Sequence, residues 1–287
     1  MRRRFLSAGV MAALALIAAT AARAAFPAPE RAPDVADEFD GEALEASVWD
    51  DWIASFQGRR RGFLFARDNV AVREGKLELT ARLLRDDEKT VENLRRGFDT
   101  YATALVRAKA KTFYGYYEIR ARGMKAAVSN AFWLYDPLSD APEKKFRPGD
   151  FSEEIDVFEF FGKLGSITNS GCERAYYTTV HRLRTPYLEG LVVGGVEQLE
   201  NRTRTTRVDF DFWADYHVYG FDWSAERLTW YVDGREVFSR ANDCFHRPLH
   251  VTFDCEIMYD WAGEPDQADL PQVFSIDYYR HWKASEP

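Results

Sequence analysis

Hydrophobic and polar residues alternate along most of this chain with the two-residue period of a half-buried β-strand. From residue 69 onward, apolar side chains occupy every second position, as in Leu77, Leu79 and Ala81. The same pattern predicts further strands at 102–110, 117–121, 130–136, 153–161, 175–183, 216–223, 249–257 and 274–282. Many short strands separated by turn residues are typical of a sandwich or barrel, and not of a parallel sheet covered by helices.

Turn and loop signals divide these strands. Asp233-Gly234, between LTWYV and REVF, predicts a β-hairpin, because both residues tolerate a positive φ. Only residues 41–49 and the highly charged residues 85–96 have helical character. Residues 136–150, DPLSDAPEKKFRPGD, are a polar insertion between two strands, either a solvated excursion or a functional loop beside the sheet.

The N-terminus has the pattern of an export signal. Residues 1–24 have a basic start, a short apolar stretch and a small-residue cleavage site, and Arg2-Arg3-Arg4 resembles a twin-arginine motif. A membrane anchor is the alternative, but the apolar stretch ends at Arg23 without a stop-transfer pattern. We therefore expect a secreted or periplasmic protein without membrane association, with an extended, mobile leader at 25–35 and a single domain at 36–287.

The net charge limits the binding partners of the chain, and its cysteine content limits the possible disulfides. Removing the signal deletes four arginines and no acids, which takes the formal net charge from −8 to −12. A chain so acidic repels polyanions, so nucleic acid is excluded as a partner. We also expect a monomer.

Of the three cysteines, Cys244 and Cys255 are the more plausible disulfide pair with Cys172 left over, while free buried thiols remain an equal alternative.

The most informative segment is EEIDVFE at 153–159, where acids interrupt an apolar run. Burying unpaired carboxylates is costly, so these side chains should face a cleft. A regular strand would point Glu154 and Asp156 to one face and Glu159 to the other. One extra residue in a β-bulge at Val157-Phe158 would return Glu159 to the first face. A solvated strand face is the alternative, but the surrounding valine and phenylalanines argue against it.

Three acids in such a line suit glycosidic bond hydrolysis. A retaining glycosidase uses one ionised carboxylate as nucleophile and one carboxylic acid as acid and then base, about 5–5.5 Å apart. A third acid between them can share a proton with the nucleophile, because like charges at close range disfavour joint ionisation.

The segment EIDVFE resembles the E-x-D-x-x-E signature of glycoside hydrolase family 16 in its β-bulge form, the branch of β-agarases, β-porphyranases, carrageenases and laminarinases. GYYEIRARGM, NAFWLYD, HVYGFDWSAERLTWYVDGREV and IDYYRHW are similar in order and spacing to other parts of that family. The resemblance implies an all-β, concanavalin-like jelly roll of two antiparallel sheets with a concave substrate cleft. It also implies a retaining, endo-acting enzyme in which Glu154 is the nucleophile, Asp156 the assisting acid and Glu159 the acid/base. No cofactor is then needed for catalysis.

The resemblance also suggests residues that bind the sugar. Trp133 matches a tryptophan that forms a sugar platform. Phe56 and Arg59 fall on the agarase and porphyranase pattern W-x-G-R-x-P, although Phe56 replaces the tryptophan and Arg61 the proline. Glu256, in FDCEIMYDWAG, matches an acidic contact, and its side chain should face opposite that of Cys255.

Two further positions are weaker candidates for substrate contact. His217 matches a histidine frequent in the family, although a structural histidine is an equal alternative. Trp261 is a candidate sugar platform. The resemblance also allows one structural calcium near Asp277, which nothing in the local sequence requires.

The resemblance favours a galactan of agarose or porphyran type as substrate. A β-1,3-glucan is the alternative, but the laminarinase branch has a W-P pair and a G-E-I-D motif where this chain reads FWLYD and SEEID. A lectin on the same fold is disfavoured because a binder has no use for three aligned acids. A metal site on His246 and His250 is disfavoured because Pro248 interrupts any helix between them.

Overall fold

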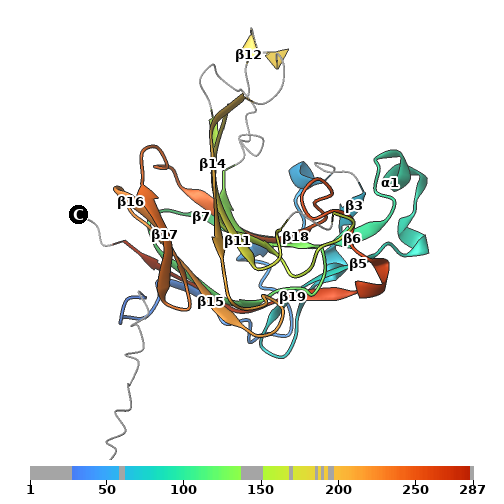
Figure 1. Cartoon of the computed structure of the whole chain (residues 1–287), viewed down its shortest axis with the longest axis horizontal. Helices are drawn as coiled ribbons and strands as arrows, with labels where there is room; N and C mark the ends of the chain where they lie inside the picture. Colours follow the sequence, from blue (N-terminus) through green and yellow to red (C-terminus); the bar gives the residue numbers. More distant parts are fainter. Residues whose placement is uncertain are drawn as a thin grey trace, which may run out of the picture.

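The computed structural model describes residues 28–57, 62–136, 151–167, 171–184, 187–188, 191–192 and 197–284. Two large sheets lie face to face, with β15 and β19 in one layer and β7, β18 and β11 in the other (Figure 1). Most strand pairs are antiparallel, as in the predicted jelly roll. The predicted fold class is confirmed.

The ten-stranded sheet has the order β17-β16-β15-β8-β19-β5-β6-β3, with β1 on β19 and β4 on β5. Its strands are β1 Val35–Asp37, β3 Phe63–Phe65, β4 Val70–Val72, β5 Leu77–Leu83, β6 Tyr101–Thr103, β8 Gly115–Arg122, β15 His217–Trp223, β16 Arg227–Val232, β17 Arg235–Ala241 and β19 Gln272–Lys283.

The seven-stranded sheet has the order β14-β11-β10-β9-β18-β7-β2 and bends upward from β18 to β14 (Figure 1). Its strands are β2 Trp49–Asp50, β7 Leu105–Thr112, β9 Ser129–Tyr135, β10 Phe151–Phe161, β11 Ala175–Arg184, β14 Glu197–Arg207 and β18 Leu249–Glu256. A small pair, β12 Tyr187–Leu188 and β13 Leu191–Val192, lies beyond it.

The core between the sheets follows the predicted alternation. Leu77, Leu79 and Ala81 of β5 are fully buried. Aromatic rings fill the centre, where Phe158 of the seven-stranded sheet meets Tyr219 of the other with ring centroids 4.6 Å apart. The predicted strands are present, except that the one expected at 102–110 is divided between β6 of the ten-stranded sheet and β7 of the seven-stranded sheet. The hairpin turn at Asp233 and Gly234 has φ values of 48° and 76°.

The helical predictions succeed only in part. Residues 85–96 form a 3₁₀ turn at Asp86–Glu88 and the short helix α1, Val91–Arg95. Residues 41–49 form bends and a turn that lead into β2, so the helix expected there is wrong. The reason is tertiary, because Trp49 is drawn into the core against Phe253 and its indole donates to the Asp37 carboxylate at 2.8 Å.

The N-terminal part of the domain starts earlier than expected. The Trp282 indole donates to the Arg31 carbonyl at 2.7 Å, the Lys283 amide donates to the Asp34 carboxylate at 2.8 Å, and Val35 begins β1. Residues 31–35 are therefore docked on β19, and the prediction of a mobile leader is wrong for them. The signal at 1–24, Arg59 and residues 137–150 of the insertion lie outside the described residues.

Two other sequence predictions can be compared with the structure. The three cysteines are free thiols, so the bridge between Cys244 and Cys255 is not formed. Cys255 is fully buried in the core, as the free-thiol alternative expected. Among the described residues, no helix is long and apolar enough to cross a bilayer.

Candidate active site

The strand that carries the acids, β10, contains the predicted β-bulge. Asp156 pairs with Thr179 of β11 and Glu159 with Tyr177, so three steps on β10 oppose two on β11. The pairing with β9 shifts between Asp156 and Phe158. The extra residue brings Glu159 to the face that Glu154 and Asp156 already occupy.

Buried side chains from behind the sheet hold the bulge in place. The Tyr176 hydroxyl donates to the Val157 carbonyl at 2.8 Å, and the Trp230 indole donates to the Asp156 carbonyl at 3.2 Å. Both carbonyls lie where the strand ladder is irregular, and a buried carbonyl without a partner is unfavourable. The core therefore specifies the geometry of the acids.

Replacing Tyr176 by Phe should lower the free energy of unfolding by about 1–3 kcal/mol, because the Val157 carbonyl loses its buried donor. Tyr219→Phe is a matched control, since Tyr219 is equally buried, stacks on Tyr176, and has a hydroxyl with no partner among the described residues. Thermal and urea unfolding of both variants measures the difference. Equal effects of the two substitutions would show that the hydroxyl does not support the bulge.

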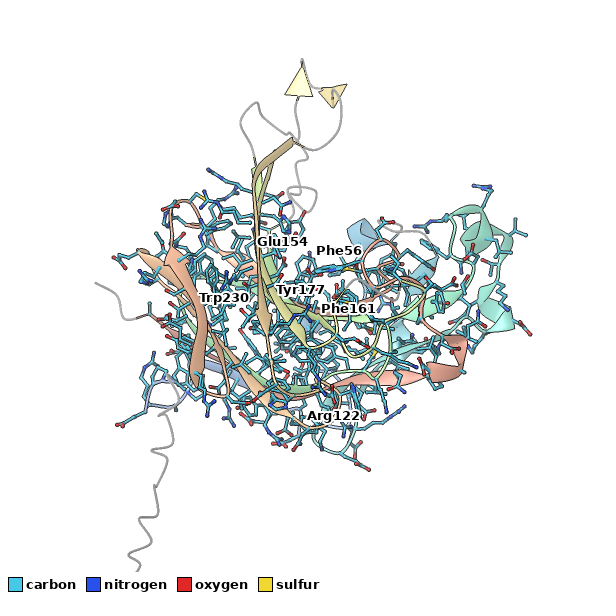
Figure 2. The ribbon with its side chains drawn as sticks, in the orientation of Figure 1. Phe56, Arg122, Glu154, Phe161, Tyr177 and Trp230 are labelled. Carbon is cyan, nitrogen blue, oxygen red and sulfur yellow. The ribbon has the colours of Figure 1, made fainter. Side chains whose placement is uncertain are left out.

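The three acids open into one groove on the outer face of the seven-stranded sheet. A hollow of about 240 Å³ is lined by Phe56, Ala131, Trp133, Glu154, Asp156, Glu159, Asp254, Glu256 and Met258. A second hollow of about 340 Å³ shares Glu154, Glu159 and Met258 with the first and continues over β11 and β14. Glu154 and Phe56 lie on the same side of the upright strands in Figure 2.

Asp156 is the most buried of the three acids, with 3% of its surface exposed. Burial raises the pKa of Asp156 well above its usual range, and the negative charges of Glu154, Glu159 and Asp254 raise it further. A protonated Asp156 can share its proton with a neighbouring carboxylate. The cluster then carries one negative charge fewer than if all of its acids were ionised.

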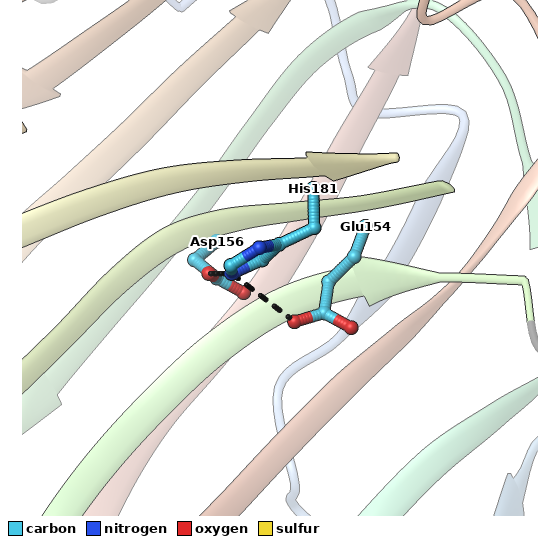
Figure 3. Close-up of side chains that lie close together, drawn as sticks. All are labelled: Glu154, Asp156 and His181. Carbon is cyan, nitrogen blue, oxygen red and sulfur yellow. Dashed lines mark ion pairs between the residues drawn. The ribbon is translucent and has the colours of Figure 1, made fainter. Parts of the chain in front are cut away.

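His181 lies beside two of the acids (Figure 3). It pairs with Glu154 across β10 and β11, and its Nε2 lies 3.8 Å from Glu154 Oε1 and 3.6 Å from Asp156 Oδ2. Burial lowers the pKa of His181, so its neutral form is favoured. In the described part of the chain these three side chains are the one group spaced to hold a metal ion. Such an ion would occupy the Glu154 carboxylate, so the hydrolysis proposed below does not use it.

Four of the predicted binding residues line the groove. Phe56, Trp133 and Glu256 line the first hollow and Trp261 the second. The Trp133 ring meets Phe56 edge-on at 5.6 Å, and its buried indole N–H has no partner among the described residues. That N–H is a donor available to a bound sugar.

Two other candidates have partners outside the groove. His217 belongs to the ten-stranded sheet, where its ring stacks on Phe210 at 3.7 Å and its Nδ1 lies 2.7 Å from the Asp233 carboxylate, so it is a structural residue. Asp277 accepts a hydrogen bond from the Arg120 guanidinium at 2.7 Å. This ion pair gives Asp277 a structural role, and the calcium near it stays a prediction.

Other residues that line the groove were not predicted from the sequence. Asp254 lies two residues before Glu256 on β18, so the alternation that places Glu256 in the groove also places Asp254 there. His181 lies two residues after Thr179 in the alternating run of β11, and both line the second hollow. Met258, which joins the two hollows, follows the end of β18 and carried no sequence signal.

A bulged strand that presents aligned acids in the groove of a two-sheet jelly roll defines a glycoside hydrolase. Residues 30–284 match the family model described as the glycoside hydrolase family 16 domain of β-porphyranases A–D, and the chain belongs to this family.

Curated relatives and a solved structure are similar to this chain over most of its length. The κ-carrageenase of Pseudoalteromonas carrageenovora is 27% identical over 86% of this chain, which spans 62% of that enzyme's length. β-Porphyranase E of Zobellia galactanivorans is 25% identical over 87% of this chain and 84% of that enzyme. The crystal structure of porphyranase B from Zobellia galactanivorans matches with a TM-score of 0.69 at 21% identity, over 86% of this chain and 90% of that one.

Proposed function

We propose that this protein is an exported, retaining endo-glycosidase that cleaves internal β-linkages of an agarose- or porphyran-type galactan. The observation that carries the proposal is the bulge in β10, which gathers Glu154, Asp156 and Glu159 in one groove. The groove continues to both sides of Glu154 and Glu159, which suits binding a polymer in its middle. The signal pattern at 1–24 supports export.

The proposed reaction is a double displacement. The Glu154 carboxylate attacks the anomeric carbon while the Glu159 carboxylic acid gives its proton to the departing glycosidic oxygen, so that one C–O bond forms as another breaks. Glu159, now a carboxylate, then takes a proton from water, which attacks the same carbon and releases Glu154. Two inversions leave the β configuration unchanged.

The surrounding residues support these two roles. Asp156 lies between the two glutamates in sequence, and its raised pKa lets it hold a proton beside Glu154. Trp133 lies directly across the strand pair from Asp156 and offers an aromatic face and an N–H to the sugar.

The choice of galactan rests on the family and on the charge of the groove. The family model describes β-porphyranases, and the relatives compared above include a β-porphyranase and a κ-carrageenase. Five carboxylates line the first hollow, at positions 154, 156, 159, 254 and 256. Such a lining repels a sulfate at the point of cleavage, which favours a weakly sulfated repeat there over a heavily sulfated one.

A reducing-end assay on porphyran, agarose, κ-carrageenan and laminarin tests this proposal, with Glu154→Gln as the inactive reference. We expect oligosaccharides from porphyran or agarose. Cleavage of laminarin alone would overturn the galactan assignment and leave the catalytic assignment intact. No cleavage of any of the four would overturn both.

A further inference from the structure

The inner face of the edge strand β14 is unusual for a sandwich. In the pairing with β11, Arg202 lies opposite Val180 and Arg204 opposite Thr178. Val180 and Thr178 are buried at 1% and 2% exposure, on the face opposite the groove residue Thr179. This row faces the other sheet and would ordinarily be apolar. Here it carries two arginines.

These arginines line a hollow of about 490 Å³ at the open edge between the two sheets. Its other walls include Trp230 of β16 with Phe238 and Arg240 of β17. Trp230 lies on the opposite side of the upright strands from Glu154 (Figure 2), so the arginines of this hollow face away from the acids of the groove, although both hollows include Thr179, Asn201 and Thr203 of the strands between them. The volume is within the range of small-molecule sites.

The chemistry of this hollow suits an anion. Among the described residues that line it, three are arginines and none is acidic. Arg204 lies 6.0 Å from the Phe238 ring centre. The Arg240 side chain is only 11% exposed and its guanidinium lies 3.5 Å from the carboxylate of Asp243, which does not line the hollow. The buried Thr178 hydroxyl, which has no partner among the described residues, adds a neutral donor. Guanidinium groups with a hydroxyl bind tetrahedral oxyanions through charge-assisted hydrogen bonds.

A second basic hollow shows the contrast. It includes Lys163, Arg174 and Arg207 and measures about 530 Å³, but Arg174 lies 2.7 Å from the Asp211 carboxylate and Lys163 2.7 Å from that of Asp269. Two acids, Glu173 and Asp211, also line this second hollow, which makes it a weaker candidate for anion binding.

We propose that the hollow between β14 and β17 is a second, non-catalytic site that binds a sulfate ester of a galactan chain. The inference rests on the proposed substrate class. Arg202, Arg204 and Arg240 surround the sulfate, and Phe238 offers a ring against which the sugar packs. A chain held there stays close to the groove, which raises the effective concentration of linkages to cut.

Calorimetric titration of the full chain carrying Glu154→Gln tests the site without hydrolysis. The probes are a sulfated porphyran oligosaccharide, its desulfated counterpart, sodium sulfate and sodium phosphate. The test variant adds R202T and R204T, which suit an exposed, threonine-rich edge strand. The control adds R73T and R95T, which remove the same charge from exposed positions elsewhere.

We expect two binding events for the sulfated oligosaccharide and one for the desulfated chain. R202T/R204T should weaken the second event at least tenfold, and R73T/R95T should leave it unchanged. An unchanged second event in R202T/R204T, or equal binding of the desulfated chain, would overturn the proposal. So would arginine-dependent binding of free sulfate or phosphate without any of the oligosaccharide.

Two controls keep the result interpretable. Circular dichroism establishes folding, and R204T alone replaces the double variant if that variant unfolds. A wild-type chain that binds through these arginines and cleaves no galactan would refute the proposed function and leave the second site standing. A galactan-cleaving enzyme without arginine-dependent binding would refute the second site alone.

Discussion

Glu154→Gln should lower kcat on the galactan by roughly 10³-fold or more, because an amide cannot form the covalent bond to the anomeric carbon. Glu159→Gln should lower kcat by about 10²- to 10⁴-fold, the range expected for loss of a general acid and base. Initial rates of reducing-end release measure both effects. Glu236→Gln, an exposed position on β17, is the control and should keep full activity.

An activated substrate separates the two roles. A nitrophenyl leaving group departs without a proton, so Glu159→Gln should recover most of its kcat/KM on a nitrophenyl oligosaccharide, whereas Glu154→Gln should not. If both variants recovered equally, or neither did, the assignment of nucleophile and acid would be wrong.

Asp156→Asn should have opposite effects on activity and on stability. Activity should fall about 10- to 100-fold, the equivalent of one to two pKa units of lost coupling to the nucleophile. Stability at neutral pH should rise, because the buried carboxyl group has its pKa raised in the folded protein and asparagine cannot ionise. A functional residue that destabilises its fold is the expected outcome for an acid held in a buried site.

The pH dependence of this stability difference follows from proton linkage. The unfolded chain releases the Asp156 proton near its ordinary pKa of about 4, while the folded protein keeps it to higher pH. Stability is therefore lost as pH rises from that value toward the folded pKa. The advantage of Asp156→Asn in melting temperature should be present at pH 7–8 and should vanish below pH 4. An advantage that did not change with pH would contradict this account.

The bulge in β10 could be predicted from the sequence, because the apolar residues of this strand must be buried and its acids must not. The apolar residues of β10 define a strand, and the acids at 154, 156 and 159 can share a face only if one extra residue is inserted. Glu256 could be placed for the same reason, since its neighbour Cys255 had to be buried.

Other features depend on which strands become neighbours, and one strand alone does not determine that. His217 has suitable chemistry, but β15 joins the other sheet. β14 has no apolar alternation, because one face carries Asn201 and Thr203 in the groove and the other carries arginines. The helical composition of residues 41–49 yields to the burial of Trp49.

The central claim is that the bulge in β10 places a nucleophile and an acid/base for double displacement. Proton NMR of the first product released from the galactan tests it most directly, because the new reducing end appears before mutarotation mixes the anomers. The account predicts that the β-anomer accumulates first. Initial release of the α-anomer would show a single displacement by water and would contradict the roles given to Glu154 and Glu159.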